Sequence, residues 1–355
     1  MKTPEILEHL KSRIVEGEFK PGEKLPNRPE LLREYSVSVS AFQKCINQLS
    51  DWNFLESKGM KGVCVTPNPP HLCRFAVLLP IKADRILEET DSLVAAFKQV
   101  VDEWLGEHPE FSFQYYHVGP PATPEMDEWE RFCSDATRGL LAGAVNLMVA
   151  PPAELQRRLE DFPNVVVSLK REDMPHNSPD IEFDLVEMFR KQLAHLMASG
   201  CRNIAVLLND NTSITKSLAI MDIAEQSGVN CPRRWILGMN RNRTRTLFYD
   251  NLLELLFSPA GNPVPDGLIV QNENFLPVVM NTFSRLRIIP GEQVKIVSHA
   301  NMPIVRPRMA GVDYTFFPIR EVLRESIGLL ARWKNGTLEN RTVNILIPPS
   351  DGIVY

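Results

Sequence analysis

The segment from Ser38 to Leu49 carries polar side chains at a spacing suited to reading DNA. Its apolar residues recur at i, i+3, i+4 and i+7 between Phe42 and Leu49, which predicts a helix with one buried stripe. The opposite face carries hydroxyl, amide and ammonium groups, which hydrogen-bond to base edges and phosphates. Ser38 is also placed to cap the helix. The candidate DNA contacts on this face are Ser38, Ser40, Gln43, Lys44 and Asn47.

A predicted hairpin follows this helix. The apolar runs 54–57 and 63–66 are joined by a tip with two glycines and two lysines, Lys58 and Lys61. Such a tip is typical of the wing of a winged helix-turn-helix, and both lysines are candidate DNA contacts.

A second group of polar residues follows predicted strands in the rest of the chain. The carboxyl ends of parallel strands meet at one edge of a sheet, where ligands bind in α/β proteins. Charged and amide groups there predict a site for a small polar metabolite, with no cofactor. The candidate effector contacts from these loops are Lys82, Asp84, Arg171, Asn272, Glu273 and Asn301.

The sequence contains few of the patterns that are typical of enzymes. The seven histidines show no metal-ligand spacing, and the chain has no GxSxG, P-loop or GxGxxG motif. The adjacent carboxylates Glu88 and Glu89 are typical of a helix surface. We therefore expect neither an enzyme nor a metal site.

The predicted helices and strands that position these groups form two regions with different patterns. Residues 1–66 read as a small α+β winged helix-turn-helix domain, with helices before Gly17 and from Asn27 to Tyr35. Residues 67–73 are a proline-rich linker, expected to be extended. From residue 74 to 355 apolar strands alternate with amphipathic helices, which indicates parallel sheets covered on both faces and two α/β lobes.

The composition of the chain limits the classes of protein to which it can belong. The chain has 355 residues, 44% of them hydrophobic and 23% charged, with a net charge of −5, which excludes a general nucleic-acid coat. Its six cysteines form no CxxC pair, so neither disulfides nor zinc are expected. With no predicted signal peptide or membrane span, the expected location is the cytoplasm.

The first segment resembles the GntR family of bacterial transcription regulators. This resemblance implies a winged helix-turn-helix that binds double-stranded operator DNA as a homodimer. The residues that carry it are Gly17, Pro21-Gly22, Leu25-Pro26, Val37-Ser38, Leu49, Leu55, Gly62 and Val65.

The remaining chain resembles the effector domain of LacI-type regulators, which is similar to two-lobed periplasmic binding proteins. Lys216 stands where that type has a ligand-gripping arginine, and Asn272-Glu273 stand where it has Asn-Asp, whereas Ala300 replaces an aspartate. Lys216 is thereby a further candidate effector contact, and it is not expected to support the core. The matching segments are 75–80, 199–205, 265–273 and 289–294.

The head also departs from the GntR pattern. The arginine of the Leu-Pro-Ser motif is shifted by one position, to Arg28, and Pro29 occupies its usual place. Val39 replaces an arginine that contacts DNA in the family. Arg28 is therefore a candidate DNA contact, and the family's usual operator preference is not expected.

The sequence thus predicts a ligand-responsive transcription regulator of a metabolic operon, specifically a repressor that senses a sugar or related metabolite. One alternative is a metabolite-binding protein with a decayed DNA-binding head. A second alternative is a two-domain enzyme in which the first segment is only a packing module.

Overall fold

The computed structural model describes ten stretches of the chain, which form two compact units. The first unit contains residues 1–83 and 103–164, and the second contains residues 84–102 and 165–355. The described stretches are 3–59, 62–80, 92–118, 126–147, 157–168, 178–209, 212–239, 246–258, 263–303 and 307–350.

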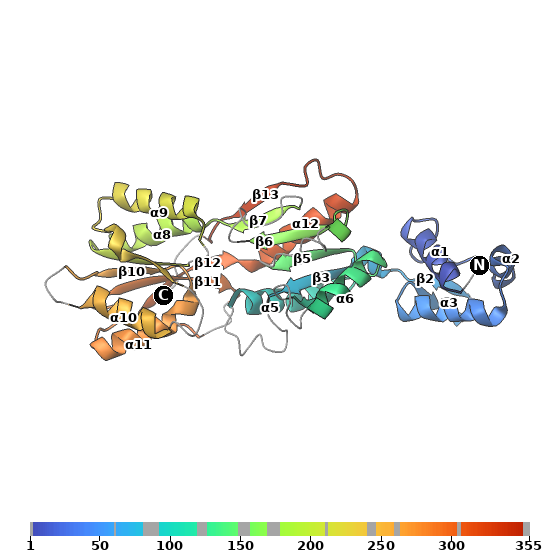
Figure 1. Ribbon diagram of the computed structural model, residues 1–355, viewed down its shortest axis with the longest axis horizontal. Helices are drawn as coiled ribbons and strands as arrows, with labels where there is room; N and C mark the ends of the chain where they lie inside the picture. Colours follow the sequence, from blue (N-terminus) through green and yellow to red (C-terminus); the bar gives the residue numbers. More distant parts are fainter. Residues whose placement is uncertain are drawn as a thin grey trace. The chain divides into compact units, whose positions relative to one another are not determined.

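The first unit begins with a small segment, residues 3–66, that we call the head (Figure 1). Three helices precede an antiparallel hairpin in which Leu55 pairs with Val65 and Ser57 with Val63. The winged helix-turn-helix expected from the sequence is therefore present. Its elements are α1 (Thr3–Val15), α2 (Arg28–Tyr35), α3 (Val39–Asp51), β1 (Leu55–Ser57) and β2 (Val63–Val65).

The predicted apolar stripe of α3 forms the centre of the head core. Phe42, Cys45, Ile46 and Leu49 are all buried. They pack with apolar residues of α1 such as Leu10 in one cluster. The exposed face of α3 is therefore fixed by the burial of its opposite face.

The linker departs from the extended spacer expected from its prolines. Residues Pro70–Cys73 form a helical turn, α4. Proline is compatible with the first position of a helix, because the missing N–H would have no partner there. The Cys73 thiol donates to the carbonyl oxygens of Asn68 and Pro69 at 3.1 and 3.2 Å.

The first unit continues as a parallel α/β layer. The central strand β3 pairs with β4 on one side and with β5 on the other. The aromatic residues Trp129 and Phe132 of α6 bury against this layer together with Tyr116. The elements are β3 (Arg74–Leu79), β4 (Ser112–His117), α6 (Met126–Thr137) and β5 (Gly143–Leu147).

The second unit contains a five-stranded parallel sheet in the order β12-β11-β10-β8-β9. Helices α8 and α9 cover one face, and α10 and α11 cover the other (Figure 1). The strands are β8 (Ile204–Asn209), β9 (Ile236–Met239), β10 (Gly267–Val270), β11 (Lys295–Met302) and β12 (Val312–Pro318). The helices are α8 (Leu185–Ala198), α9 (Ile214–Gln226), α10 (Thr246–Phe257) and α11 (Leu276–Leu286), with 3-10 turns η4 (Arg233–Trp235) and η6 (Glu273–Phe275).

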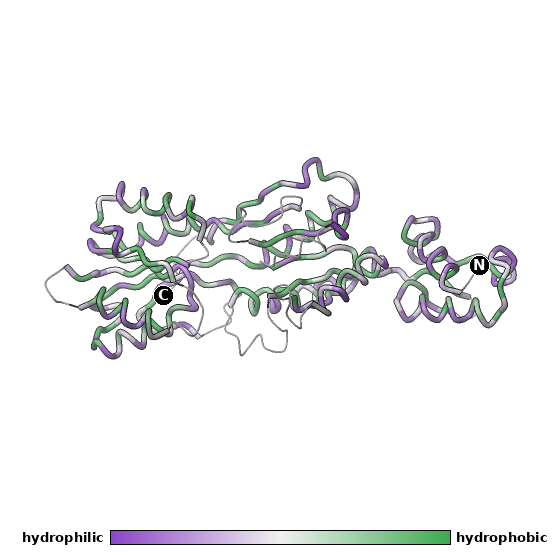
Figure 2. The backbone as a smooth tube through the Cα atoms, viewed as in Figure 1, coloured by the Kyte–Doolittle hydropathy of each residue, from purple (hydrophilic) through white to green (hydrophobic). Residues whose placement is uncertain are grey.

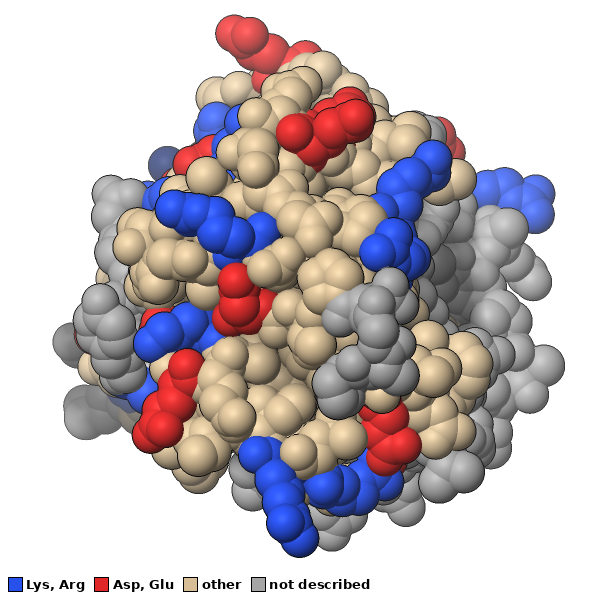
Figure 3. Space-filling view, turned by 90° about the vertical axis from the view of Figure 1, so that its left-hand side faces the viewer, with Lys and Arg blue, Asp and Glu red and all other residues tan. Residues whose placement is uncertain are grey.

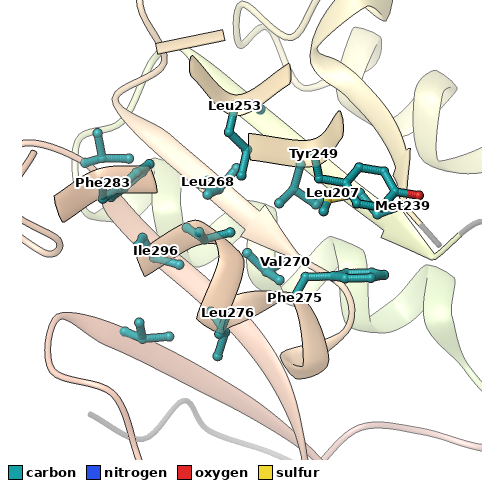
Figure 4. Close-up of a cluster of buried hydrophobic side chains, with 14 of the residues drawn as sticks. Leu207, Met239, Tyr249, Leu253, Leu268, Val270, Phe275, Leu276, Phe283 and Ile296 are labelled. Carbon is teal, nitrogen blue, oxygen red and sulfur yellow. The ribbon is translucent and has the colours of Figure 1, made fainter. Parts of the chain in front are cut away.

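Alternation along β8 explains why both faces are covered. Ile204 and Val206 pack in the cluster that contains α8 and α9. Ala205 and Leu207 pack in the opposite cluster with Phe283 of α11 (Figure 4). Because successive side chains of a strand point to opposite faces, an all-apolar strand requires two hydrophobic layers. The strands are accordingly mostly green in Figure 2.

A second set of parallel strands, β6-β7-β13, completes the fold, with β7 at its centre. The strand β7 was not expected from the sequence, and neither were β13 and α12. The remaining elements are α5 (Ser92–Glu107), β6 (Asn164–Ser168), β7 (Asp180–Phe183), α12 (Ile319–Lys334) and β13 (Asn344–Ile347).

Candidate DNA interface and effector site

The exposed face of α3 presents the polar residues expected from the sequence. Ser38 caps the helix, and its hydroxyl oxygen accepts from the backbone N–H of Ala41 at 3.3 Å. Ser40, Lys44 and Asn47 are exposed. The predicted cap and the predicted exposure of this face are therefore confirmed.

A row of three side chains links α2 to α3. The guanidinium of Arg28 donates to the Gln43 amide oxygen at 2.6 Å, and the Gln43 amide nitrogen donates to the Asn47 amide oxygen at 2.7 Å. The Asn47 amide nitrogen takes part in neither of these two hydrogen bonds. Because the side chains hold one another, less rotamer freedom is lost on binding.

The wing at the β1–β2 turn has a different electrostatic character. The Lys58 ammonium lies 2.8 Å from the Glu56 carboxylate, and the hydrogen bond between these groups raises the pKa of Lys58. The positive charge of Lys58 is thus partly neutralised by its own strand. Lys61 lies outside the described residues.

Ion pairs also neutralise cations elsewhere in the head. Lys11 pairs with Glu8 at 2.5 Å, and Arg13 pairs with Glu18 and with Glu34 at 2.5 and 2.8 Å. The hydrogen bond with Glu18 raises the pKa of Arg13. The Arg13–Glu34 pair links α1 to α2, and these pairs neutralise part of the positive charge of the head.

The end of the second unit shown in Figure 3 offers no concentrated positive surface among its described residues. Lysine and arginine side chains alternate there with aspartate and glutamate around an uncharged centre (Figure 3). A duplex requires clustered positive charge, which this face lacks in the part of the chain that the structure describes.

The candidate effector residues of the second unit follow neighbouring strands. Lys216 lies in the first turn of α9, after β8, and Asn272 and Glu273 directly follow Gln271 at the end of β10. Asn301 lies near the end of β11. Because β8, β10 and β11 are adjacent and parallel, their carboxyl ends meet at one edge of the sheet. Lys82, Asp84 and Arg171 lie outside the described residues.

Lys216 has a partner that the sequence did not indicate. Its ammonium forms an ion pair with the Glu182 carboxylate, and the side chains are 16% and 9% exposed. Glu182 lies on β7, and its other carboxylate oxygen accepts from the Asn344 amide at 3.0 Å on β13. A charged residue within the apolar run 181–183 is the sequence signal that could have indicated a buried ion pair.

Buried amides form the rest of this edge. The side chain of Gln271 is almost completely buried, and neither its amide oxygen nor its amide nitrogen has a hydrogen-bond partner within the described residues. Asn272 caps η6 by accepting from the Asn274 N–H at 3.0 Å. The Asn301 amide donates to Ser92 at 3.0 Å. Gln271 is thus a polar group that sequence reasoning missed.

Neither metal-binding nor membrane-spanning features occur in the part of the chain that the structure describes. Its histidines, cysteines and carboxylates form no group of three that could hold a metal ion. None of its helices is long and apolar enough to cross a membrane.

The family of bacterial regulatory proteins called gntR matches residues 2–65. This match covers the helices and the wing of the head, so this segment is a GntR-type helix-turn-helix. Among curated proteins, no significant match is found.

Solved structures of regulators share the fold of this chain over 78–99% of its length. The transcriptional regulator CelR in complex with cellobiose is 13% identical, has a TM-score of 0.62, and covers 99% of this chain and 98% of its own. A LacI family transcriptional regulator from Arthrobacter sp. FB24 in complex with lactose is 14% identical, has a TM-score of 0.62, and covers 80% of this chain and 98% of its own. A regulatory protein of LacI family from Chloroflexus aggregans is 15% identical, with a TM-score of 0.60 and coverage of 78% and 95%.

Proposed function

We propose that this chain, which begins with a gntR-family helix-turn-helix and continues in the fold of LacI-family regulators, is a ligand-responsive transcription regulator. We assign it the role of a repressor in the cytoplasm. The head binds operator DNA, and the α/β part binds a small polar metabolite of the sugar class. The observation that carries this proposal is the polar face of α3, presented to solvent by a fully buried opposite stripe.

DNA recognition is divided between two kinds of contact. The amide groups of Gln43 and Asn47 suit adenine edges in the major groove, whereas Lys44 and Arg28 suit phosphates. Ser38 and Ser40 lie at the amino-terminal end of α3, where free N–H groups favour a phosphate. Lys58 and Lys61 of the wing are assigned to the DNA backbone.

The effector site is assigned to the carboxyl edge of the five-stranded sheet. Its described residues are Lys216, Asn272, Glu273 and Asn301, to which we add Gln271 and Glu182. The unpartnered amide of Gln271 supports a ligand there, because a buried polar group without a partner destabilises the folded state by about 1–3 kcal/mol. Two of the similar structures hold disaccharides, lactose and cellobiose, which supports the sugar class. Lys82, Asp84 and Arg171 complete the proposed set.

We further propose that the chain forms a homodimer and that each chain is divided into three functional segments. Residues 1–66 bind DNA, residues 67–73 connect, and residues 74–355 bind effector and dimerise. A single head whose acidic residues nearly balance its basic residues binds DNA weakly, whereas two heads tethered in one dimer bind more tightly, because the second head binds at a high effective concentration. Effector binding changes the affinity for DNA because it favours one conformation of the effector domain over another.

Selection of binding sites from a random duplex pool tests the proposed function. The full-length chain should enrich a palindrome or a spaced repeat, because two equivalent heads require two half-sites. A gel shift with the enriched site and a scrambled site then measures specificity. Failure to enrich any site would contradict the proposal and favour a decayed head, for which the exposed Val39 on α3 (55% exposed) is the motivating observation.

A further inference from the structure

We propose that Lys24 is a phosphate contact and that the DNA backbone lies along a groove between α2, α3 and the wing. This inference rests on the proposed function, since it concerns how the same head holds DNA. Lys24 is not in the recognition helix or in the turn of the wing, so neither pattern indicated it.

The backbone position of Lys24 is fixed beside the wing. Lys24 forms an antiparallel bridge with Cys64. The flanking N–H groups of Gly22 and Leu25 donate to the carbonyl oxygens of Val65 and Val63, both at 3.0 Å. Residues 22–25 thus extend the β1–β2 hairpin by a third edge, and Lys24 belongs to a rigid element.

The side chain of Lys24 lies along the wing backbone. A Cβ atom added to Gly62 would lie 3.2 Å from the Lys24 Cε and 3.9 Å from its Nζ. Gly62 has φ = +89°, a conformation that favours glycine. The absence of a side chain at this position lets the lysine stem lie close to the wing.

Lys24 borders an open groove of ≈ 260 Å³. The apolar residues Leu31, Phe42 and Ile46 line it, and Lys24, Arg28 and Gln43 contribute its polar groups. Lys24 therefore shares one surface depression with two residues that we already assign to DNA. A backbone that passes between the recognition helix and the wing must cross this depression.

The ion pairs of the head leave Lys24 without a carboxylate partner among the described residues. Lys11, Arg13 and Lys58 each have a carboxylate within 4.0 Å. Among the described residues of the head, no such partner occurs for Lys20, Lys24, Arg28, Arg33 or Lys44. Because a paired cation has already lost part of its attraction for phosphate, the two unpaired cations that line this groove, Lys24 and Arg28, are suited to hold the DNA backbone there.

Three variants and one control test the inference. Lys24→Met retains the aliphatic stem beside Gly62 and removes the charge, whereas Lys24→Arg retains the charge. Lys20→Met removes an exposed charge four residues away that does not line the groove. A Lys24→Met/Arg28→Met double variant tests whether both contact the backbone independently. Circular dichroism melting establishes that each variant is folded.

The readout is the dissociation constant of the full-length protein on its selected operator at several salt concentrations. A lost phosphate contact reduces the slope of log K against log salt by about 0.9 per bound head. The ratio of the dissociation constant of Lys24→Met to that of the wild type should therefore fall by about 3.5-fold per bound head when the salt concentration rises from about 50 to about 200 mM. We expect Lys24→Arg to retain the wild-type slope, Lys20→Met to match the wild type, and the double variant to lose about twice as much slope as Lys24→Met.

Several outcomes would overturn the inference. A slope for Lys24→Met equal to that of Lys20→Met would place the backbone elsewhere while leaving DNA binding intact. A change confined to one base position of the operator would make Lys24 a base contact. A wild-type protein that selects no DNA would instead contradict the proposed function itself.

Discussion

At the scale of single residues, the proposed function assigns base reading and backbone binding to different side chains of the head. Gln43 and Asn47 are joined by a hydrogen bond of 2.7 Å, so their amides act as a pair with fixed orientation. Lys44 is exposed one residue after Gln43 and has no carboxylate partner among the described residues. Substitutions at these two positions should therefore have different consequences.

Gln43→Ala should relax base preference. Removing the amide breaks both hydrogen bonds of the row from Arg28 to Asn47 and should reduce discrimination at one operator position by about 1–3 kcal/mol. Lys44→Ala should instead weaken all sites alike. Both effects are measurable by competition between the selected operator and its single-base variants. The assignment is wrong if Gln43→Ala retains the wild-type base preference.

The ion pair between Lys216 and Glu182 changes the expectation for a substitution in the effector site. The sequence predicts that Lys216→Ala leaves the unliganded protein nearly as stable as the wild type. Because the structure gives Lys216 a mostly buried carboxylate partner, Lys216→Met should lower the free energy of unfolding by about 3 kcal/mol.

Removing both charges provides the control for this prediction. A Lys216→Met/Glu182→Gln double variant should recover part of the loss, because no uncompensated charge remains buried. Urea denaturation followed by circular dichroism measures the free energy of unfolding of the wild type, of Lys216→Met and of the double variant. A single variant as stable as the wild type would show that the pair does not contribute.

At the scale of elements, the amino-terminal end of α3 is capped by Ser38, a residue that the proposed function also assigns to DNA. Ser38→Ala removes the acceptor for the Ala41 N–H and should lower the stability of the head by about 1 kcal/mol. Ser38→Gly is the matched control, since glycine at this position costs only a few tenths of a kcal/mol relative to serine. Thermal melting of both variants checks the difference. Equal melting temperatures would mean that the cap contributes little.

Local sequence patterns predict some helices and strands of this fold and fail to predict others. The stripe from Phe42 to Leu49 identifies α3 because the periodicity of a helix is a local signal. The strand β7 was missed because Asp180 and Glu182 make it look like a polar loop. The Asp180 carboxylate accepts from Ser168 on β6, and the Glu182 carboxylate accepts from Asn344, which lies 162 residues further along the chain. The burial of these carboxylates therefore depends on pairing between strands and is visible only in the fold.

The site residues show the same division. The exposed polar face of α3 follows from its apolar stripe and was predicted. The Lys24 position was not, because it depends on pairing between Lys24 and Cys64 across the wing. The partner of Lys216 likewise lies on a strand that the sequence did not reveal. Contacts between distant segments are therefore where sequence reasoning was incomplete.

At the scale of the whole molecule, the proposed function requires a second copy of the head for firm binding of DNA. The chain should be a dimer at micromolar concentration, since only two tethered heads engage two half-sites together. Light scattering of the full-length protein measures this. A monomer that binds a single half-site tightly would contradict the prediction.

The central claim is that effector and operator DNA bind one chain and influence each other. The most direct measurement is the dissociation constant for the selected operator, by fluorescence anisotropy, with and without sugars found by a thermal-shift screen. We expect at least one sugar to weaken DNA binding, and operator DNA to weaken binding of that sugar by the same factor, since coupling between two sites is reciprocal. A sugar that binds the folded protein while leaving operator affinity unchanged would contradict the claim.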